Sequence, residues 1–153
     1  AVTDPRERWT YGQFAERIAR TAAWLRALPG VQPGDRIGIA MENCAGYLQV
    51  QYACWHAGLC VVPMNAKLHP REFCYILENS QARACIASPS LHAGIAREAG
   101  PGAPFALHEA HAPLLEKMTP EDQADVVRAA KVFYKLYADI FRALPTAREV
   151  TCN

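Results

Sequence analysis

The fold of this chain is decided by residues 36–63, which read RIGIAMENCAGYLQVQYACWHAGLCVVP. Two apolar runs in this stretch, Arg36–Met41 and Leu59–Pro63, have the length of buried strands. The segment between them is apolar on nearly every side and predicts a helix, with Asn43 as its N-cap and Gly58 at its end. Two short apolar strands joined by a helix favour parallel pairing with a right-handed crossover.

Upstream of this unit, the spacing of apolar residues predicts an amphipathic helix from about Tyr11 to Leu28. Thr10 and Gln13 have the spacing of a capping box, and Trp9 precedes the cap where it can pack on Phe14. These signals at one helix start make it the best-marked element of the chain.

Downstream, a third helix is predicted over about Pro70–Glu78 and a third strand over Ala84–Ala87. The fold class is therefore α/β, with a short parallel three-stranded βαβαβ segment preceded by an amphipathic helix. A further helix is predicted from Thr119 to about Leu144, because Thr119 can cap it and Pro145 ends it. The fold thus has a helical C-terminal tail.

Composition divides the chain into three parts. Residues 1–98 hold the α/β elements, residues 99–118 form a linker-like segment rich in Gly and Pro, and residues 119–153 hold the amphipathic helix and tail.

A parallel sheet of three strands leaves two unpaired edges. We therefore expect marginal stability for residues 1–98 alone, and self-association through the sheet edges or the C-terminal helix.

Composition also excludes several classes of function. The 153 residues are 51% hydrophobic and 20% charged, which permits a buried core, and the net charge is +1. The basic residues are scattered, so neither nucleic acid nor an anionic membrane is predicted as a partner. The uncharged stretch 43–66 is interrupted by polar residues and Pro63, so no membrane span is expected. Six cysteines without a CxxC pair favour reduced thiols in the cytoplasm.

The usual phosphate-binding and metal-binding patterns are missing. Neither G-x-x-x-x-G-K-[ST] nor G-x-G-x-x-G occurs. His108 and His111 are three apart, one short of the spacing in H-E-x-x-H, so no metal site is predicted. Nothing brings Cys44 and His56 together as a nucleophile and base, and no catalytic residue is assigned.

Six short pieces of sequence carry more information than their spacing alone. In order they are WTYGQF at 9–14, VQPGDRI at 31–37, YL at 47–48 with ACWHAG at 53–58, VVPMN at 61–65, LHPRE at 68–72 and YILENS at 75–80. Over about residues 1–98 this order resembles the N-terminal region of adenylate-forming (AMP-binding) acyl-CoA synthetases, which are acid–thiol ligases.

The resemblance implies an ATP-dependent reaction for the complete enzyme. Members of this family join a carboxylic or fatty acid to CoA through an acyl-adenylate, using ATP and Mg. Their phosphate loop, aromatic-Thr-Glu segment, ribose-binding Asp and C-terminal Lys lie downstream and have no counterpart here. The resemblance thus implies a scaffolding lobe, in a fragment or truncated product that is inactive and binds no cofactor alone.

Lys67 is the one cofactor-binding candidate that the resemblance supplies. It stands in the turn Pro63–Leu68 where the family often has an Arg, and in some members that residue meets the nucleotide end of CoA. Lysine keeps the positive charge but cannot donate two parallel hydrogen bonds to a phosphate, as the guanidinium group of arginine can. The alternative is a solvated turn lysine. Nearby, Asn43–Gly46 replaces the family's Asn-x-Pro-Glu, which should weaken the helix start by about 1 kcal/mol.

A second class of function remains open from the sequence. Residues 119–144 have an aromatic face around Phe133 and Tyr137, which is more typical of packing than of a ligand cage. The chain would then be a non-catalytic binding protein that uses this helix for docking or self-association.

Overall fold

The computed structural model describes residues 2–3 and 8–110. The helix and tail predicted over 119–153 lie outside the described residues, as does His111. In chain order the elements are β1 (Val2–Thr3), β2 (Arg8–Trp9), α1 (Tyr11–Ala27), β3 (Arg36–Ala40), α2 (Ala45–His56), β4 (Cys60–Met64), α3 (Pro70–Asn79), β5 (Ala84–Ala87), α4 (Pro89–Ala99) and β6 (Ala106–Glu109).

The central sheet is parallel and has the strand order β4-β3-β5-β6. Ile37 of β3 pairs with Val61 of β4 on one side and with Ala84 of β5 on the other. The α/β class and the parallel βαβαβ order are therefore confirmed. The sheet differs from the prediction in having a fourth strand, β6, alongside β5. Separately, β1 and β2 form a small antiparallel pair.

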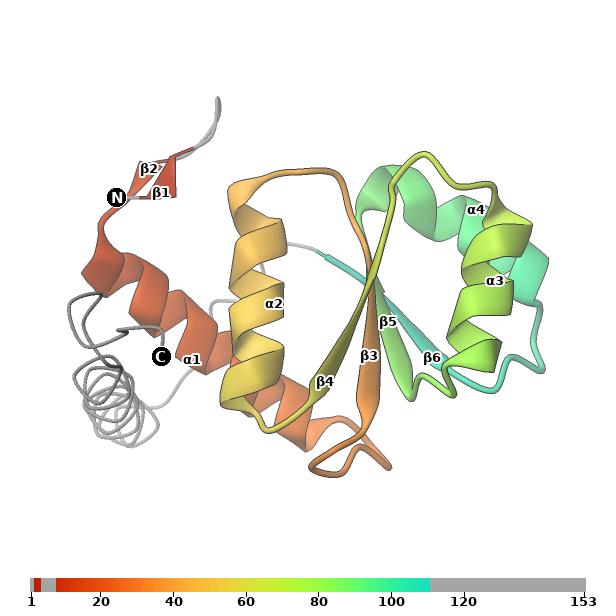
Figure 1. Cartoon of the computed structure of the whole chain (residues 1–153), viewed down its shortest axis with the longest axis horizontal. Coiled ribbons are helices and arrows are strands. Elements are labelled where there is room, and N and C mark those ends of the chain that lie inside the picture. The colour runs from red at the N-terminus through yellow and green to blue at the C-terminus, as the bar shows by residue number, and fades with distance from the viewer. Residues whose placement is uncertain (1, 4–7, 111–153) are drawn as a thin grey trace, which may run out of the picture. The chain divides into compact units, whose positions relative to one another are not determined.

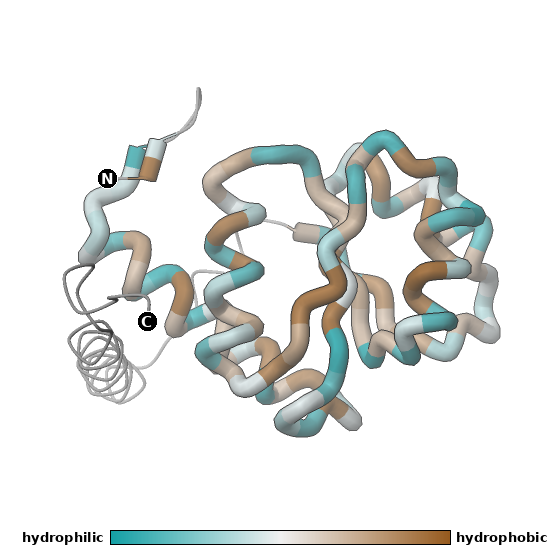
Figure 2. Tube along the Cα trace, viewed as in Figure 1, coloured by the Kyte–Doolittle hydropathy of each residue, from teal (hydrophilic) through white to brown (hydrophobic). Residues whose placement is uncertain are grey.

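Helices cover both faces of this sheet (Figure 1). Helices α1 and α2 pack on the face that carries Ile37, Ile39 and Ile86. Helices α3 and α4 pack on the opposite face, where Met64 and Cys85 lie. Side chains alternate between the faces of a strand, which divides the core into two layers. Figure 2 shows apolar residues recurring along the strands and the inner sides of the helices.

Helix α1 begins as predicted. The Gln13 backbone N–H donates to Thr10 Oγ1 at 3.2 Å, and the Thr10 backbone N–H donates to Gln13 Oε1 at 2.9 Å. These two bonds form the capping box. Trp9 stacks on Phe14 with ring centres 6.1 Å apart, so the predicted contact across the helix start is also present.

Helix α2 begins one residue later than predicted. Cys44, not Asn43, is the N-cap, because Cys44 has the extended backbone that the position requires. Its side chain makes no cap hydrogen bond, and the first turn holds no acidic residue. At the other end, Gly58 has φ +76, in the left-handed region where glycine is favoured, as the sequence predicts.

Helix α4 and strand β6 were not predicted from the sequence. In α4 only Ile95 is buried, so this helix offers the core a single fully buried side chain. Strand β6 lies within residues 99–118, whose composition predicts a linker, and its residues are exposed or half-buried, as an edge strand allows. His108 therefore lies in a strand and not on a helix.

Candidate functional site

The carboxyl edge of the sheet contains a topological switch point. From β3 the chain passes through α2 to β4 on one side, whereas from β5 it passes through α4 to β6 on the other. In open parallel sheets, ligands bind outside the carboxyl ends of the strands at such a point. The loops after β3 and β5 are therefore candidate positions for functional groups.

Three polar residues from these two loops meet at the switch point. Ser90 Oγ donates a hydrogen bond to the Glu42 carboxylate, and Ser88 Oγ and Ser90 Oγ are 3.1 Å apart. The Ser88 backbone N–H also donates to the Ala40 carbonyl at 2.9 Å. We call Glu42, Ser88 and Ser90 the switch-point cluster. It ties the loop after the first central strand to the start of α4.

A second polar pair joins α4 to the edge strand β6. His92 Nδ1 lies 3.8 Å from Glu109 Oε2, which is an ion-pair distance when His92 is protonated. The two side chains are 28% and 29% exposed, so solvent screens the contact. This contact joins α4 to the last strand at the carboxyl edge of the sheet.

Lys67 lies on the same edge but outside the switch point. It is exposed, in the turn after the outer strand β4. Its backbone N–H donates to Asn65 Oδ1 at 2.9 Å, and the Leu68 backbone N–H donates to the Asn65 carbonyl at 3.1 Å. Asn65 thus stabilises the turn. Within the described residues, the Lys67 ammonium group forms no ion pair.

Cys44 and His56 are not brought together, because they stand at opposite ends of α2. Burial, with the nearby charge of Arg26, lowers the pKa of His56. Burial also raises the pKa of the Cys54 and Cys85 thiols to about 12, so neither is a ready nucleophile.

His108 packs edge-to-face on Trp24, with ring centres 5.2 Å apart. Burial, and then the charge of His92, lower its pKa. No group of three or more metal-ligating side chains occurs in residues 2–3 and 8–110.

Sequence reasoning missed the switch-point cluster and the pair of His92 and Glu109. A signal was available, because polar residues that directly follow two central parallel strands come together at one edge. The boundary of β5 was predicted, but without α4 and β6 the direction of its next connection was unknown. The switch point could therefore not be located from sequence.

The arrangement defines a class of protein: an open parallel α/β lobe whose polar loops gather at its carboxyl edge. The family model for AMP-binding enzymes matches residues 1–146. The chain belongs to the AMP-binding enzyme family. The resemblance read from residues 1–98 is thereby confirmed, and the match extends beyond them.

Relatives of this chain include CoA ligases. It is 40% identical over 80 residues to a feruloyl-CoA synthase from an Amycolatopsis species, covering 52% of this chain and 16% of that protein. It is 36% identical over 84 residues to an acyl-CoA ligase of Aspergillus fumigatus, covering 55% and 14%. The chain thus spans about one sixth of the length of these relatives.

Solved structures agree with the sequence matches. A benzoate CoA ligase from Burkholderia xenovorans superposes with a TM-score of 0.71 at 31% identity, over 78% of this chain and 25% of that one. The N-terminal domain of FACL13 from Mycobacterium tuberculosis gives 0.62 at 25% identity, over 80% and 29%. The chain therefore corresponds to an N-terminal portion of such enzymes.

No helix in residues 2–3 and 8–110 has both the length and the apolar composition that crossing a bilayer needs.

Proposed function

We propose that residues 1–98, extended by β6, serve as the scaffolding lobe of an adenylate-forming acid–thiol ligase. The observation that carries this proposal is the superposition on a benzoate CoA ligase over 78% of the chain, together with the family match. In this role the lobe supports an active site built largely from other segments, and the switch-point cluster holds the lobe's own loops in place.

The complete enzyme would join a carboxylic acid to CoA in two steps. The acid attacks the α-phosphorus of ATP, forming an acyl-adenylate and releasing pyrophosphate, and the CoA thiol then displaces AMP. Mg would accompany the nucleotide. Aromatic acids are the first substrates to test, because the relatives include a feruloyl-CoA synthase and a benzoate CoA ligase.

The 153-residue chain alone should not catalyse the first step. Its sequence contains no glycine-rich phosphate loop ending in Lys, and Lys67 would supply only one positive charge. Without donors aimed at the triphosphate, nothing offsets the charge that develops at the attacked phosphorus.

ATP–pyrophosphate exchange tests this proposal directly. The purified chain is incubated with Mg-ATP, labelled pyrophosphate and a panel of fatty and aromatic acids, beside a complete feruloyl-CoA synthase as the positive control. We expect exchange in the control and only background in the chain. Acid-dependent exchange by the chain would overturn the claim that it is inactive alone.

Lys67 is proposed to meet a phosphate of CoA in the complete enzyme, through its exposed ammonium group at the carboxyl edge. The test is a CoA titration in the positive-control enzyme, in which the residue aligned with Lys67 is replaced by Gln. A rise in KM for CoA at unchanged KM for ATP is expected. An unchanged KM for CoA would contradict this role and indicate that Lys67 is a solvated turn residue.

A non-catalytic role is the second candidate. It rests on the amphipathic pattern of residues 119–144 and on the position of β4 and β6 at the two edges of the described sheet. Sedimentation velocity over a range of concentrations tests self-association by these routes. A cytoplasmic location is proposed with either role, because the five cysteines in the described residues are free thiols.

A further inference from the structure

Helix α2 is apolar on its exposed side as well as on the side that packs in the core. Val50 and Ala53 are buried in the core layer that α2 shares with α1. Leu48, Tyr52 and Trp55 are spaced by four and three residues, so they share one helix face, and they are 40%, 40% and 49% exposed within the described residues. We call these three residues the α2 stripe. A helix that is apolar all round is typical of a position between two packed layers.

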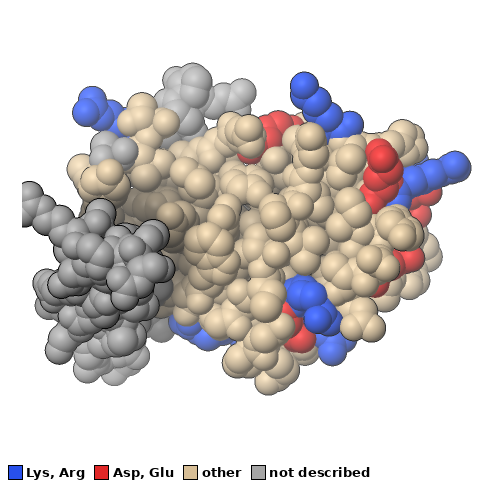
Figure 3. Space-filling view, in the orientation of Figure 1, with Lys and Arg blue, Asp and Glu red and all other residues tan. Residues whose placement is uncertain are grey.

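Charge distinguishes α2 from the other helices. None of its residues is Asp, Glu, Lys or Arg, whereas α1, α3 and α4 each carry charged residues of both signs. On α3 and α4 these charges form a surface ion pair, in which Arg71 Nε lies 3.2 Å from Glu98 Oε1. In Figure 3 the surface over the middle of α2 carries neither sign of charge. Three helices thus have a side suited to water, and α2 does not.

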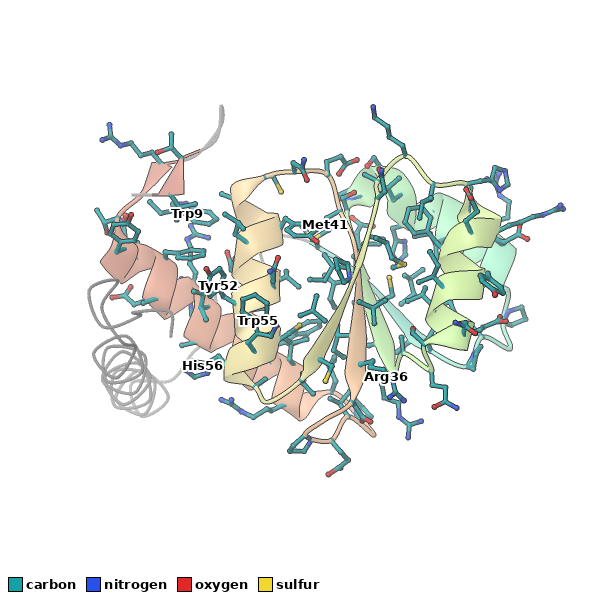
Figure 4. All side chains as sticks on the ribbon, in the orientation of Figure 1. Trp9, Arg36, Met41, Tyr52, Trp55 and His56 are labelled. Carbon is teal, nitrogen blue, oxygen red and sulfur yellow. The ribbon has the colours of Figure 1, made fainter. Side chains whose placement is uncertain are left out.

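The rings of the α2 stripe are held in place by buried rings. Tyr52 packs edge-to-face on the buried Phe14, with ring centres 5.8 Å apart, and Trp55 packs edge-to-face on Tyr52 at 5.2 Å. In Figure 4 the labelled side chains of Tyr52 and Trp55 follow one another along α2. Side chains that are already ordered lose little conformational entropy when another surface packs on them. The stripe is therefore a preformed apolar contact surface.

Most of the matched ligase fold lies outside this chain. The chain covers 25% of the benzoate CoA ligase on which it superposes. The α2 stripe is too small for a stable interface between separate proteins, which buries about 800 Å² on each partner. A contact within one folded protein does not have this requirement, because no translational or rotational freedom of a second molecule is lost. The remainder of the ligase is thus the occupant that fits the stripe best.

We propose that the α2 stripe is the surface on which an apolar, uncharged segment of the remaining ligase fold packs in the complete enzyme. The proposal rests on the proposed function, because it requires this lobe to be part of a complete ligase. Helix α2 then lies between two layers, with the core of this lobe on one side and the rest of the enzyme on the other. The lobe thus provides an apolar interface in addition to the polar loops at its carboxyl edge.

Lysine substitutions in two proteins test the proposal. Leu48→Lys and Trp55→Lys are made in the full chain, and lysine is placed at the superposed positions of the complete benzoate CoA ligase. Urea unfolding gives the loss of unfolding free energy in each variant. We expect small losses in the chain, as for other surface substitutions. In the complete ligase we expect losses about threefold larger or more, because an apolar interface leaves the ammonium group without water or a partner.

Tyr75→Lys and its counterpart in the ligase are the matched control, because Tyr75 is 67% exposed on the charged helix α3. Their losses should be small in both proteins. Insolubility of the ligase variants at the stripe, beside a soluble control variant, counts as a large loss and supports the proposal. Small losses in both proteins would overturn it, because the stripe would then face solvent in the complete enzyme.

Two other outcomes would also overturn the proposal. Large losses in both proteins would mean that the segment covering the stripe belongs to this chain. Equal losses at the stripe and at the position of Tyr75 in the ligase would mean that the effect is not specific to α2. The measured quantity is stability, so these outcomes are independent of ATP–pyrophosphate exchange, which tests the proposed function separately.

Discussion

Gly38 of the central strand β3 faces the Leu77 side chain of α3. A Cβ at this position would stand 2.3 Å from Leu77 Cδ2 and 3.1 Å from Met64 Cε. Gly38 has an ordinary backbone conformation, since its φ is not positive. The glycine is needed because the strand and the helix pack against each other at that point.

Gly38→Ala should therefore lower the free energy of unfolding by about 1–3 kcal/mol, the usual cost of overpacking a filled core. Urea unfolding followed by circular dichroism measures it. Gly102→Ala is the matched control, because a Cβ there meets nothing within 4 Å. Equal midpoints for the two variants would contradict the close approach of β3 and α3.

Because the Cys85 thiol is buried, we expect the free energy of unfolding to change with pH in the alkaline range. Burial raises its pKa from 9.0 to about 12. Between these values the unfolded chain has released a proton that the folded chain still holds. The free energy of unfolding is thus unaffected below about pH 9 and falls as pH rises above it, by up to about 1.4 kcal/mol per pH unit.

Comparing urea unfolding at about pH 8 and about pH 10.5 tests this effect in the parent chain and in Cys85→Ala. The variant should be less stable at both values because of the cavity, but it should lose less between them. Parallel losses in the two proteins would show that the Cys85 thiol does not titrate differently on folding.

The two helices on one face of the sheet differ in how they begin. Helix α1 has a complete capping box, whereas α2 begins at Cys44 without a side-chain cap bond and without an acidic residue in its first turn. Serine at an N-cap position accepts a hydrogen bond from the first turn, which typically stabilises a helix by about 1 kcal/mol. The weak start of α2 is therefore a place where one substitution can add stability.

Cys44→Ser should raise the free energy of unfolding by about 1 kcal/mol. Thermal unfolding of the full chain measures the change. Cys60→Ser is the control, since Cys60 is exposed at the first residue of β4 and caps no helix. A rise in both variants, or in neither, would argue against the cap as the cause.

The sheet depends on β6 although its residues look like loop in sequence. Strand β5 is buried along its whole length: β3 and β6 pair with it on either side, and its side chains pack in the two core layers. Removing β6 would leave the β5 backbone groups on that side without partners and open an apolar edge.

A chain ending at residue 98 should therefore unfold at lower urea concentration than a chain ending at residue 110, and should aggregate more readily. The full chain is the reference; circular dichroism during urea titration gives the unfolding midpoints, and light scattering follows aggregation. Equal midpoints for the two truncated chains would mean that β6 adds nothing to the sheet.

Most of the scaffold was predictable from local signals. The start of α1, the strand–helix–strand unit of residues 36–63 and the left-handed Gly58 all follow from caps, periodicity and turn chemistry, which act over a few residues. Helix α4 and strand β6 were not predictable in this way. Ile95 is the one buried residue of α4, and β6 is stabilised by pairing with β5 and not by its own composition.

What the order of residues determined is thus the class of fold and the family, because strand and helix patterns and short ordered motifs are local properties of the chain. The polar contact between Glu42 and Ser90 joins residues 48 apart, and the contact between Arg26 and His56 joins residues 30 apart. Such contacts form only after the strands are ordered in the sheet and each helix is packed on one of its two faces. The switch-point cluster is for that reason a property of the folded molecule.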